Sequence, residues 1–188
     1  MKIISGFLKG RKIQGYDIEG TRPTMDRVRE SLFSMIQNYI PNSIALDLFC
    51  GCATLGLESI SNGSKICYFN DINKKCISNI KANVKEFKIE DKVIITNLDY
   101  KKALVMYKEQ RVKFDIIFLD PPYHMECINE IIEFILNNRM LNKNGIIVCE
   151  VDNNYIRKYQ NLDLTKEKKY GNKYIYILRV SDDGAIDE

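Results

Sequence analysis

The sequence predicts an α/β fold, with a mostly parallel sheet covered by helices on both faces and an antiparallel hairpin near its C-terminal end. Three observations support this prediction. From residue 44 onward, short apolar runs alternate with segments of helical length, as in doubly wound sheets. A glycine-punctuated turn joins the first apolar run to the helix that follows it. Near the C-terminus, Gly171-Asn172 separates two strand-like runs, and such a two-residue turn is typical of a hairpin.

The N-terminal segment has a different pattern from the rest of the chain. Residues 1–20 are expected to form a short extended pair with turns at Gly6, Gly10 and Gly15. Thr24 is of a type favoured at helix N-caps. Apolar residues then recur at every fourth position, and Pro41 is expected to end this helix. The recurring residues are Val28, Leu32, Ile36 and Ile40.

The alternating part supplies the predicted sheet and its covering helices. Strands are expected near residues 44–49, 65–69, 92–96, 114–119 and 145–151. Helices are expected near residues 55–61, 73–87, 100–110 and 125–138. The hairpin pairs residues 164–170 with 173–180. We expect a single domain over residues 1–188, with an extension at 1–40, a core at 41–180 and a polar tail at 181–188.

Composition narrows the class of protein. Hydrophobic residues make up 45% of the chain and charged residues 28%, which is ordinary for a soluble globular domain. No apolar run approaches the length of a membrane span, and the N-terminus has no apolar leader, so we expect a cytoplasmic protein. The six cysteines show no paired C-x-x-C spacing and are expected to be reduced core residues. No metal site is expected, and nothing in the sequence requires more than a monomer.

Basic residues are concentrated near the N-terminus. Residues 1–30 contain seven basic and four acidic residues, a local excess that matches the net charge of +3 of the whole chain. Such a patch suits contacts with nucleic-acid phosphates, although a solvated face would have the same composition. The basic residues are Lys2, Lys9, Arg11, Lys12, Arg22, Arg27 and Arg29.

The fourth predicted strand ends at Asp120-Pro121-Pro122-Tyr123. Two consecutive prolines offer no N–H groups, so the strand stops and a stiff loop follows. This loop carries an acid, a backbone carbonyl and an aromatic ring at the carboxyl edge of the sheet, where open α/β sheets bind ligands. These groups suit a flat substrate with an exocyclic amine, such as a nucleobase. The alternative is a proline-rich turn with a surface tyrosine.

The first three strands also contribute acids, one within the first strand and one after each of the next two. Asp47 precedes the turn at Gly51, where the backbone can approach a ligand and the next helix presents its N–H groups. Asp71 lies about 20 residues beyond that glycine, an offset at which acids bind ribose hydroxyls. The alternative is that Asp71 caps the next helix. Asp99 could accept from an adenine amine or cap the helix at 100–110.

These motifs resemble those of class I S-adenosylmethionine-dependent methyltransferases, and more closely those of the RsmD-like bacterial small-subunit ribosomal RNA guanine-N2 methyltransferases. The resemblance covers nearly the whole chain. Its most specific stretch is Arg22–Phe33. The other matching segments are Ile3–Gly6, Gly10–Lys12, Asp47–Gly51, Leu55–Glu58, Asp71, Asp99, Asp120–Tyr123 and Lys169–Gly171.

The resemblance implies a Rossmann-like seven-stranded sheet and methyl transfer from S-adenosylmethionine to the exocyclic N2 of a guanine in 16S ribosomal RNA, within the small subunit or an assembly intermediate. Catalysis would fall to Asp120, Pro121, Pro122 and Tyr123. The implied cofactor contacts are Thr24, Asp47, Phe49, Gly51, Gly56, Asp71, Ile72, Asp99 and Asp120. The candidate RNA contacts are Lys9, Arg11, Lys12, Arg22, Arg27 and Tyr123, and the resemblance also places Arg29 near the cofactor or the RNA.

One position departs from the family pattern, and other functions stay open. The family turn usually reads Gly-Ser-Gly, whereas this chain has Gly51-Cys52-Ala53, so an alanine stands where a glycine is expected. If that position needs a positive φ, the alanine costs about 1 kcal/mol. The alternatives are a DNA adenine-N6 methyltransferase, which shares the Asp-Pro-Pro-Tyr motif, and a non-catalytic RNA-binding module. A nucleotide-dependent dehydrogenase is disfavoured because G-x-G-x-x-G is missing.

Overall fold

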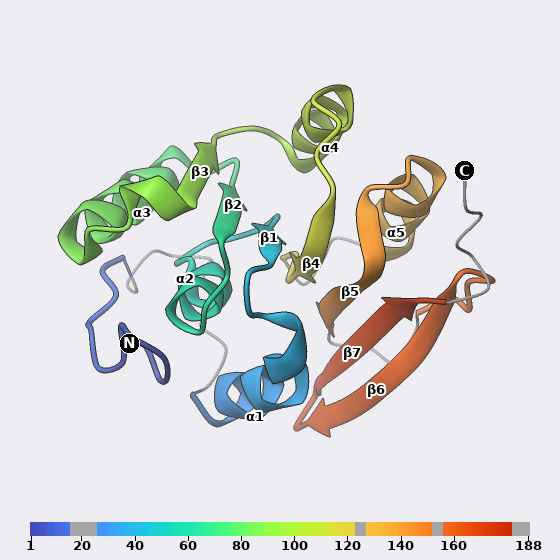
Figure 1. Ribbon diagram of the computed structural model, residues 1–188, viewed down its shortest axis with the longest axis horizontal. Helices are drawn as coiled ribbons and strands as arrows, with labels where there is room; N and C mark the ends of the chain where they lie inside the picture. Colours follow the sequence, from blue (N-terminus) through green and yellow to red (C-terminus); the bar gives the residue numbers. More distant parts are fainter. Residues whose placement is uncertain (16–25, 123–126, 152–155, 182–188) are drawn as a thin grey trace.

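The protein is built around one seven-stranded sheet, seen in a computed structural model that describes residues 1–15, 26–122, 127–151 and 156–181 (Figure 1). The strand order is β3-β2-β1-β4-β5-β7-β6. Neighbouring strands from β3 to β5 are parallel, whereas β7 is antiparallel to both β5 and β6. The predicted α/β fold with a terminal hairpin is therefore confirmed. The strands are β1 Ile44–Asp47, β2 Ile66–Asn70, β3 Val93–Thr96, β4 Phe114–Leu119, β5 Leu141–Val151, β6 Leu162–Tyr170 and β7 Lys173–Val180.

Two helical layers cover the sheet, and each seals its own apolar core (Figure 1). Helices α1 (Asp26–Ile36), α2 (Thr54–Ser61) and α3 (Lys74–Phe87) pack on one face. Helices α4 (Tyr100–Glu109) and α5 (Ile128–Asn137) pack on the other. Because both faces are covered, the central strands are continuous apolar runs and do not alternate between polar and apolar residues.

Several predicted boundaries shift for physical reasons. The first strand ends at Asp47, because Leu48 and Phe49 already form the turn. Helix α1 ends at Ile36 and passes into a 3₁₀ turn over Gln37–Tyr39, so Pro41 lies beyond the helix end. In the first fifteen residues, Lys2 and Lys12 make one isolated antiparallel bridge, which is less than the predicted extended pair. The predicted cap Thr24 lies outside the described residues.

Strands β5 and β6 begin earlier than predicted, whereas β7 has the predicted bounds. β5 begins at Leu141, which pairs with Phe114, and the register then shifts across the polar run so that Ile116 pairs with Ile146. β6 begins at Leu162 and contains a bulge between Leu164 and Lys166. At the hairpin turn, Gly171 has a φ of 61°, which suits a glycine at the first of the two turn positions.

A buried ion pair holds the N-terminal segment on the core. The Arg29 side chain is fully buried, and its Nε donates to Glu58 Oε1 at 3.1 Å. Its Nη2 donates to the Lys2 carbonyl at 2.7 Å. The same Glu58 carboxylate accepts from the backbone N–H of Ile4 at 2.6 Å. Burial raises the pKa of Glu58, and the Ile4 N–H and the Arg29 charge oppose that rise. Arg29 therefore faces the N-terminal segment, in contrast to its expected place near cofactor or RNA.

Two further sequence expectations can be compared with the structure. All six cysteines are buried, as predicted for core residues, and no disulfide joins them. Within the described ranges, no helix has the length and apolar character needed to cross a membrane.

Candidate active site

The parallel register brings the carboxyl ends of four strands to one edge of the sheet. Each of these strands is completed or followed by an acid. Asp47 is the last residue of β1, Asp71 follows β2, Asp99 lies beyond β3 and Asp120 follows β4. This is the edge at which open α/β sheets bind ligands, so the four acids define the candidate site.

Asp47 is buried at this edge, and its pKa is strongly raised. Its side chain is 2% exposed, and Oδ2 accepts from the N–H of Gly56 at 3.0 Å. Burial raises the pKa of Asp47 from 3.8 to about 7, the Gly56 hydrogen bond opposes this rise, and the nearby Asp71 charge adds to it. Burial makes the ionised form of this carboxyl unfavourable when no opposite charge is near. A cationic ligand would supply that charge and favour the ionised form.

Asp71 organises the loop after β2. Its Oδ2 accepts from the Gly51 N–H and its Oδ1 from the Asn73 N–H, both at 2.8 Å. The cap of α3 is Asn73 itself, whose side chain accepts from the Lys75 N–H at 2.9 Å. The capping alternative for Asp71 is therefore wrong. The neighbouring Ile72 is 70% exposed, which places an apolar side chain in solvent beside the acid.

Asp99 caps helix α4. Its Oδ1 accepts from the Lys101 N–H at 2.9 Å, so the capping alternative is correct for this acid. The Phe49 ring reaches the same region and packs against Tyr100, with ring centroids 5.4 Å apart. Phe49 thus joins the turn after β1 to the start of α4.

The turn that leads into α2 contains a strained residue. Ala53 has φ 60° and ψ 24°, the left-handed conformation, and is fully buried at the start of α2. A non-glycine residue there costs about 1–2 kcal/mol. Gly56 is needed for packing, because a Cβ at this position would lie 2.2 Å from Cε1 of Phe69. Position 53 thus has the positive φ that favours glycine, although this chain has an alanine there.

Two asparagines that the sequence reasoning missed connect the loops of this edge. Asn70 Nδ2 donates to the carbonyls of Leu48 at 3.2 Å and Leu98 at 3.0 Å, and so ties the segments after β1 and β3 together. Asn97 Nδ2 donates to the carbonyls of Asp71 at 2.7 Å and Ile72 at 3.0 Å. Asparagine is abundant in this chain, and neither residue belongs to a recognisable spacing.

The loop after β4 is described in part. Asp120 is half-buried, Pro121 is buried and Pro122 is exposed. Tyr123 lies outside the described residues, as do Arg22 and Thr24. Within the described ranges, no group of three or more His, Cys, Asp and Glu side chains could hold a metal ion.

The described candidates for RNA binding lie on two elements, the N-terminal segment and α1. Arg11 packs on α3, where Nη2 donates to the Glu86 carbonyl at 3.0 Å and the guanidinium stands 4.9 Å from the centroid of the Phe87 ring. Lys9 and Lys12 are exposed on the same N-terminal segment, whereas Arg27 is exposed on α1.

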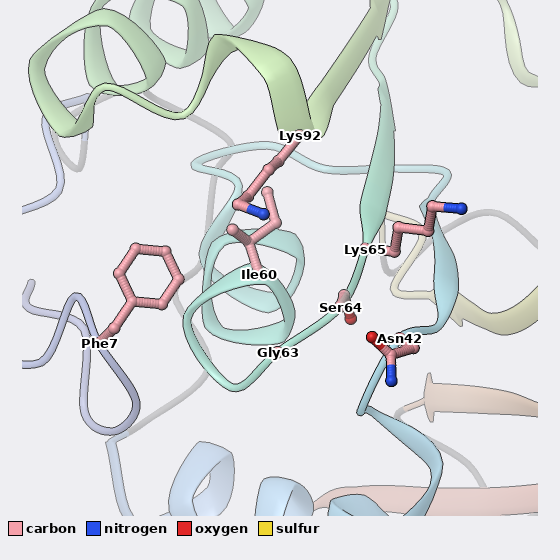
Figure 2. Close-up of a pocket in the computed structure, with 7 residues that line it drawn as sticks. All are labelled: Phe7, Asn42, Ile60, Gly63, Ser64, Lys65 and Lys92. Carbon is pink, nitrogen blue, oxygen red and sulfur yellow. The ribbon is translucent and has the colours of Figure 1, made fainter.

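A cavity of about 470 Å³ lies at the opposite edge of the sheet (Figure 2). Asn42, Lys65 and Lys92 line it, and these residues precede β1, β2 and β3. The cavity is therefore separate from the four acids. Its remaining lining residues are Phe7, Ile60, Gly63 and Ser64.

Comparison with known proteins identifies the family. Residues 1–179 match the family described as "Conserved hypothetical protein 95". The chain is 39% identical over 185 residues to the ribosomal RNA small subunit methyltransferase D of Buchnera aphidicola (subsp. Acyrthosiphon pisum), covering 93% of this chain and 92% of that protein. It is 34% identical over 176 residues to the protein of the same name from Haemophilus influenzae, covering 91% and 89%.

Solved structures give the same fold. The structure of yhhF from Escherichia coli has a TM-score of 0.84 at 26% identity, covering 96% of this chain and 98% of that chain. The structure of SMU.776 complexed with SAH (S-adenosylhomocysteine) has a TM-score of 0.70 at 14% identity, covering 86% and 50%, and shows likeness of fold alone. Together with the motifs at the sheet edge, these matches show that the chain belongs to the RsmD-like family, the one described as conserved hypothetical protein 95.

Proposed function

We propose that the protein transfers a methyl group from S-adenosylmethionine to the exocyclic N2 of a guanine in 16S ribosomal RNA. The observation that carries this proposal is the edge of the sheet where Asp47, Asp71 and Asp99 lie beside the Asp120-Pro121-Pro122 loop. The relatives that share this chain's family are named as ribosomal RNA small subunit methyltransferases, which supports the same class of substrate.

The residues of the edge fit the proposed cofactor. Its methionine part carries an ammonium group, for which the buried Asp47 carboxyl offers a counter-charge. Asp71 accepts two backbone N–H groups, yet each carboxylate oxygen can accept more than one hydrogen bond, so it can also hold ribose hydroxyls. The exposed Ile72 side chain supplies an apolar surface for the adenine. Asp99 caps α4 through Oδ1, and its carboxylate can accept a further hydrogen bond from the adenine amine. When bound, the cofactor supplies an electrophilic methyl group.

The chain's own residues would align the amine. The exocyclic nitrogen of guanine is a weak nucleophile because its lone pair is delocalised into the ring. The Asp120 carboxylate and the Pro121 carbonyl are proposed to accept its two hydrogens and direct the lone pair toward the methyl group. With the cofactor bound, the nitrogen would take the methyl group while the sulfur leaves as a neutral sulfide, and the proton that the nitrogen loses would pass through the Asp120 carboxylate to water. Tyr123 is proposed to stack on the base, worth about 1–3 kcal/mol in single-stranded recognition.

The proposed reaction also sets requirements for the RNA. A base edge inside a helix is out of reach, so the target guanine must be unpaired or flipped out. Phosphate contacts are proposed for Lys9, Arg11, Lys12, Arg22 and Arg27, with Arg11 first giving up part of its contact with α3. We propose that Thr24, Phe49, Gly51 and Gly56 complete the cofactor site, and that the protein acts as a cytoplasmic monomer.

Methyl transfer from labelled S-adenosylmethionine to small ribosomal subunits from cells without the endogenous enzyme tests the proposal. Wild-type protein should label the 16S RNA, and Asp120→Ala should not. Asp91→Ala is the matched control, because it removes an exposed acid from the turn before β3, at the opposite edge of the sheet. Label that persists in Asp120→Ala would contradict the role of that acid. Cofactor binding without any label in RNA would favour the DNA adenine alternative, and no cofactor binding would favour the non-catalytic module, for which strained Ala53 is the main support.

A further inference from the structure

The edge strand β6 exposes both of its faces. Residues 163–169 are all exposed, and among them are Lys166, Lys168 and Lys169. The two faces differ in charge, and pairing with β7 assigns each side chain to one of them. Lys166 and Lys168 lie opposite Ile177 and Ile175, which belong to the core on the α1 side of the sheet.

The other face of β6 is balanced. Glu167 and Lys169 lie opposite Tyr176 and Tyr174, which belong to or pack against the core on the α4–α5 side. The Lys169 Nζ stands 5.1 Å from the centroid of the Tyr174 ring. If the lysines of β6 served only to prevent this edge strand from pairing with other chains, they would be expected on either face of the strand. Here the excess positive charge lies on the α1 side.

Side-chain contacts hold this charge in place. The Lys168 Nζ donates to the Ser31 Oγ of α1 at 3.1 Å and stands 5.3 Å from the centroid of the Tyr170 ring. The Tyr170 hydroxyl donates to the same Ser31 Oγ. The exposed Arg27 precedes Ser31 by four residues and so lies on the same side of α1. Together Arg27, Ser31, Lys166, Lys168 and Tyr170 form what we call the α1–hairpin surface.

Acids near this surface lie beside basic residues or point elsewhere. The exposed Asp163 lies on the same face of β6, opposite the basic Arg179 of β7. Glu150, on the same side of the sheet, is paired with Lys173. The exposed Glu30 adjoins Ser31 on α1 but points about 100° away from it around the helix. Two lysines and an arginine beside an aromatic ring match the chemistry of a nucleic-acid backbone and its bases.

The α1–hairpin surface lies near the candidate site. Val151, at the carboxyl end of β5, pairs with Tyr174, so the hairpin turn sits at the same edge as the Asp120 loop. In Figure 1, α1 lies beside the end of β6. Three strand spacings separate β4 from β6, about 14 Å in all. A single strand whose base occupies the site can therefore reach the surface within a few nucleotides.

We propose that the α1–hairpin surface binds the phosphates of the ribosomal RNA strand that flanks the target guanine. This inference rests on the proposed function and adds a second RNA contact to it, separate from the N-terminal lysines. The surface would hold the flanking strand while the Asp120 loop holds the base. Its loss should weaken RNA binding and leave the chemistry of a bound guanine unchanged.

The double variant Lys166→Gln/Lys168→Gln tests the inference. The matched control, Lys108→Gln/Lys169→Gln, removes the same two charges from α4 and from the other face of β6. Binding of 16S RNA is measured at several salt concentrations, and methyl transfer is measured as kcat and KM. For single strands each phosphate contact contributes about 0.7 to the slope of log K against log salt, so the test variant should lose about 1.4 from that slope. Its KM should rise with kcat unchanged.

Each outcome decides the inference. The inference would be overturned if the test variant, the control and the wild type had the same salt slope and the same KM. It would also be overturned if both variants lost RNA affinity equally, because the α1-side lysines would then have no special role. Unchanged melting temperature and S-adenosylhomocysteine affinity in the test variant confirm that its fold is intact. A wild-type protein that neither binds nor methylates RNA would instead refute the proposed function, and the inference with it.

Discussion

Replacing the buried Asp47 carboxyl by an amide should stabilise the protein in the absence of ligand and weaken cofactor binding. Asp47 is 2% exposed, and its pKa is raised from 3.8 to about 7, chiefly by burial. One pKa unit corresponds to about 1.4 kcal/mol, so the ionised carboxyl destabilises the folded state by about 4 kcal/mol. Asp47→Asn keeps an oxygen that can accept from Gly56 but buries an amide NH₂, which costs about 1–3 kcal/mol if unsatisfied.

The sign of the pH dependence is fixed by the raised pKa. Between pH 4 and 7 the folded protein binds a proton at Asp47 that the unfolded chain releases, so this group's contribution to stability is lost as the pH rises through that interval. Asp47→Asn has no group that ionises at this position, so its stability does not fall in this way. The free energy of unfolding of Asp47→Asn minus that of wild type should therefore grow by a few kcal/mol from pH 4 to pH 8.

Urea unfolding of both proteins across this pH range measures the difference, and calorimetry with S-adenosylhomocysteine measures binding. At pH 7 the variant should bind more weakly, because the ligand's ammonium group loses its counter-charge. Wild-type protein should release a proton on binding near pH 6.5, seen as a binding enthalpy that depends on the buffer. A stability difference that stays constant with pH would refute the reasoning about burial, and unchanged affinity would refute the placement of the ammonium group.

Three other changes test the packing around the site. Gly56→Ala should cost about 1–3 kcal/mol in urea unfolding, because the new methyl group would meet the Phe69 ring at 2.2 Å, and an unchanged midpoint would contradict this contact. Arg29→Met should lower the free energy of unfolding by about 3–5 kcal/mol at neutral pH, because it leaves the Glu58 carboxylate buried without its partner. A loss below about 1 kcal/mol would show that this ion pair is not needed for stability. Asn97→Ala removes the hydrogen bonds that fix the Asp71–Ile72 loop, so the affinity for S-adenosylhomocysteine should fall while the melting temperature hardly changes. Equal affinities of variant and wild type would mean that the loop holds its shape without these hydrogen bonds.

The sequence predicted the fold and the position of the acids because both follow from one pattern. Apolar runs that alternate with helical segments imply parallel strands, and parallel strands place their carboxyl ends at one edge. The acids after β1, β2 and β4 could therefore be assigned to that edge without any knowledge of contacts. For position 53 the sequence alone does not decide whether the expected glycine serves a positive φ or a close approach, and the structure shows that the position has a positive φ.

What the sequence did not predict depends on which side chains meet across the fold. Arg29 is an ordinary basic residue in the sequence, and only the packing of α1 on α2 reveals that its charge is buried against Glu58. Asn70 and Asn97 act through carbonyls of loops that are distant in sequence. For Asp71 and Asp99, the choice between capping and ligand binding depended on local geometry, and the structure assigned the cap of α3 to Asn73.

The identity of the methylated nucleoside tests the central claim most directly. Small subunits from cells without the endogenous enzyme are incubated with the protein and S-adenosylmethionine, and the digested 16S RNA is analysed by mass spectrometry. The account predicts one new N2-methylguanosine per RNA with wild-type protein and none with Asp120→Ala. A methyl group on another base or another guanine atom would contradict the proposed geometry of the amine, and no methylated nucleoside at all would contradict the proposed activity.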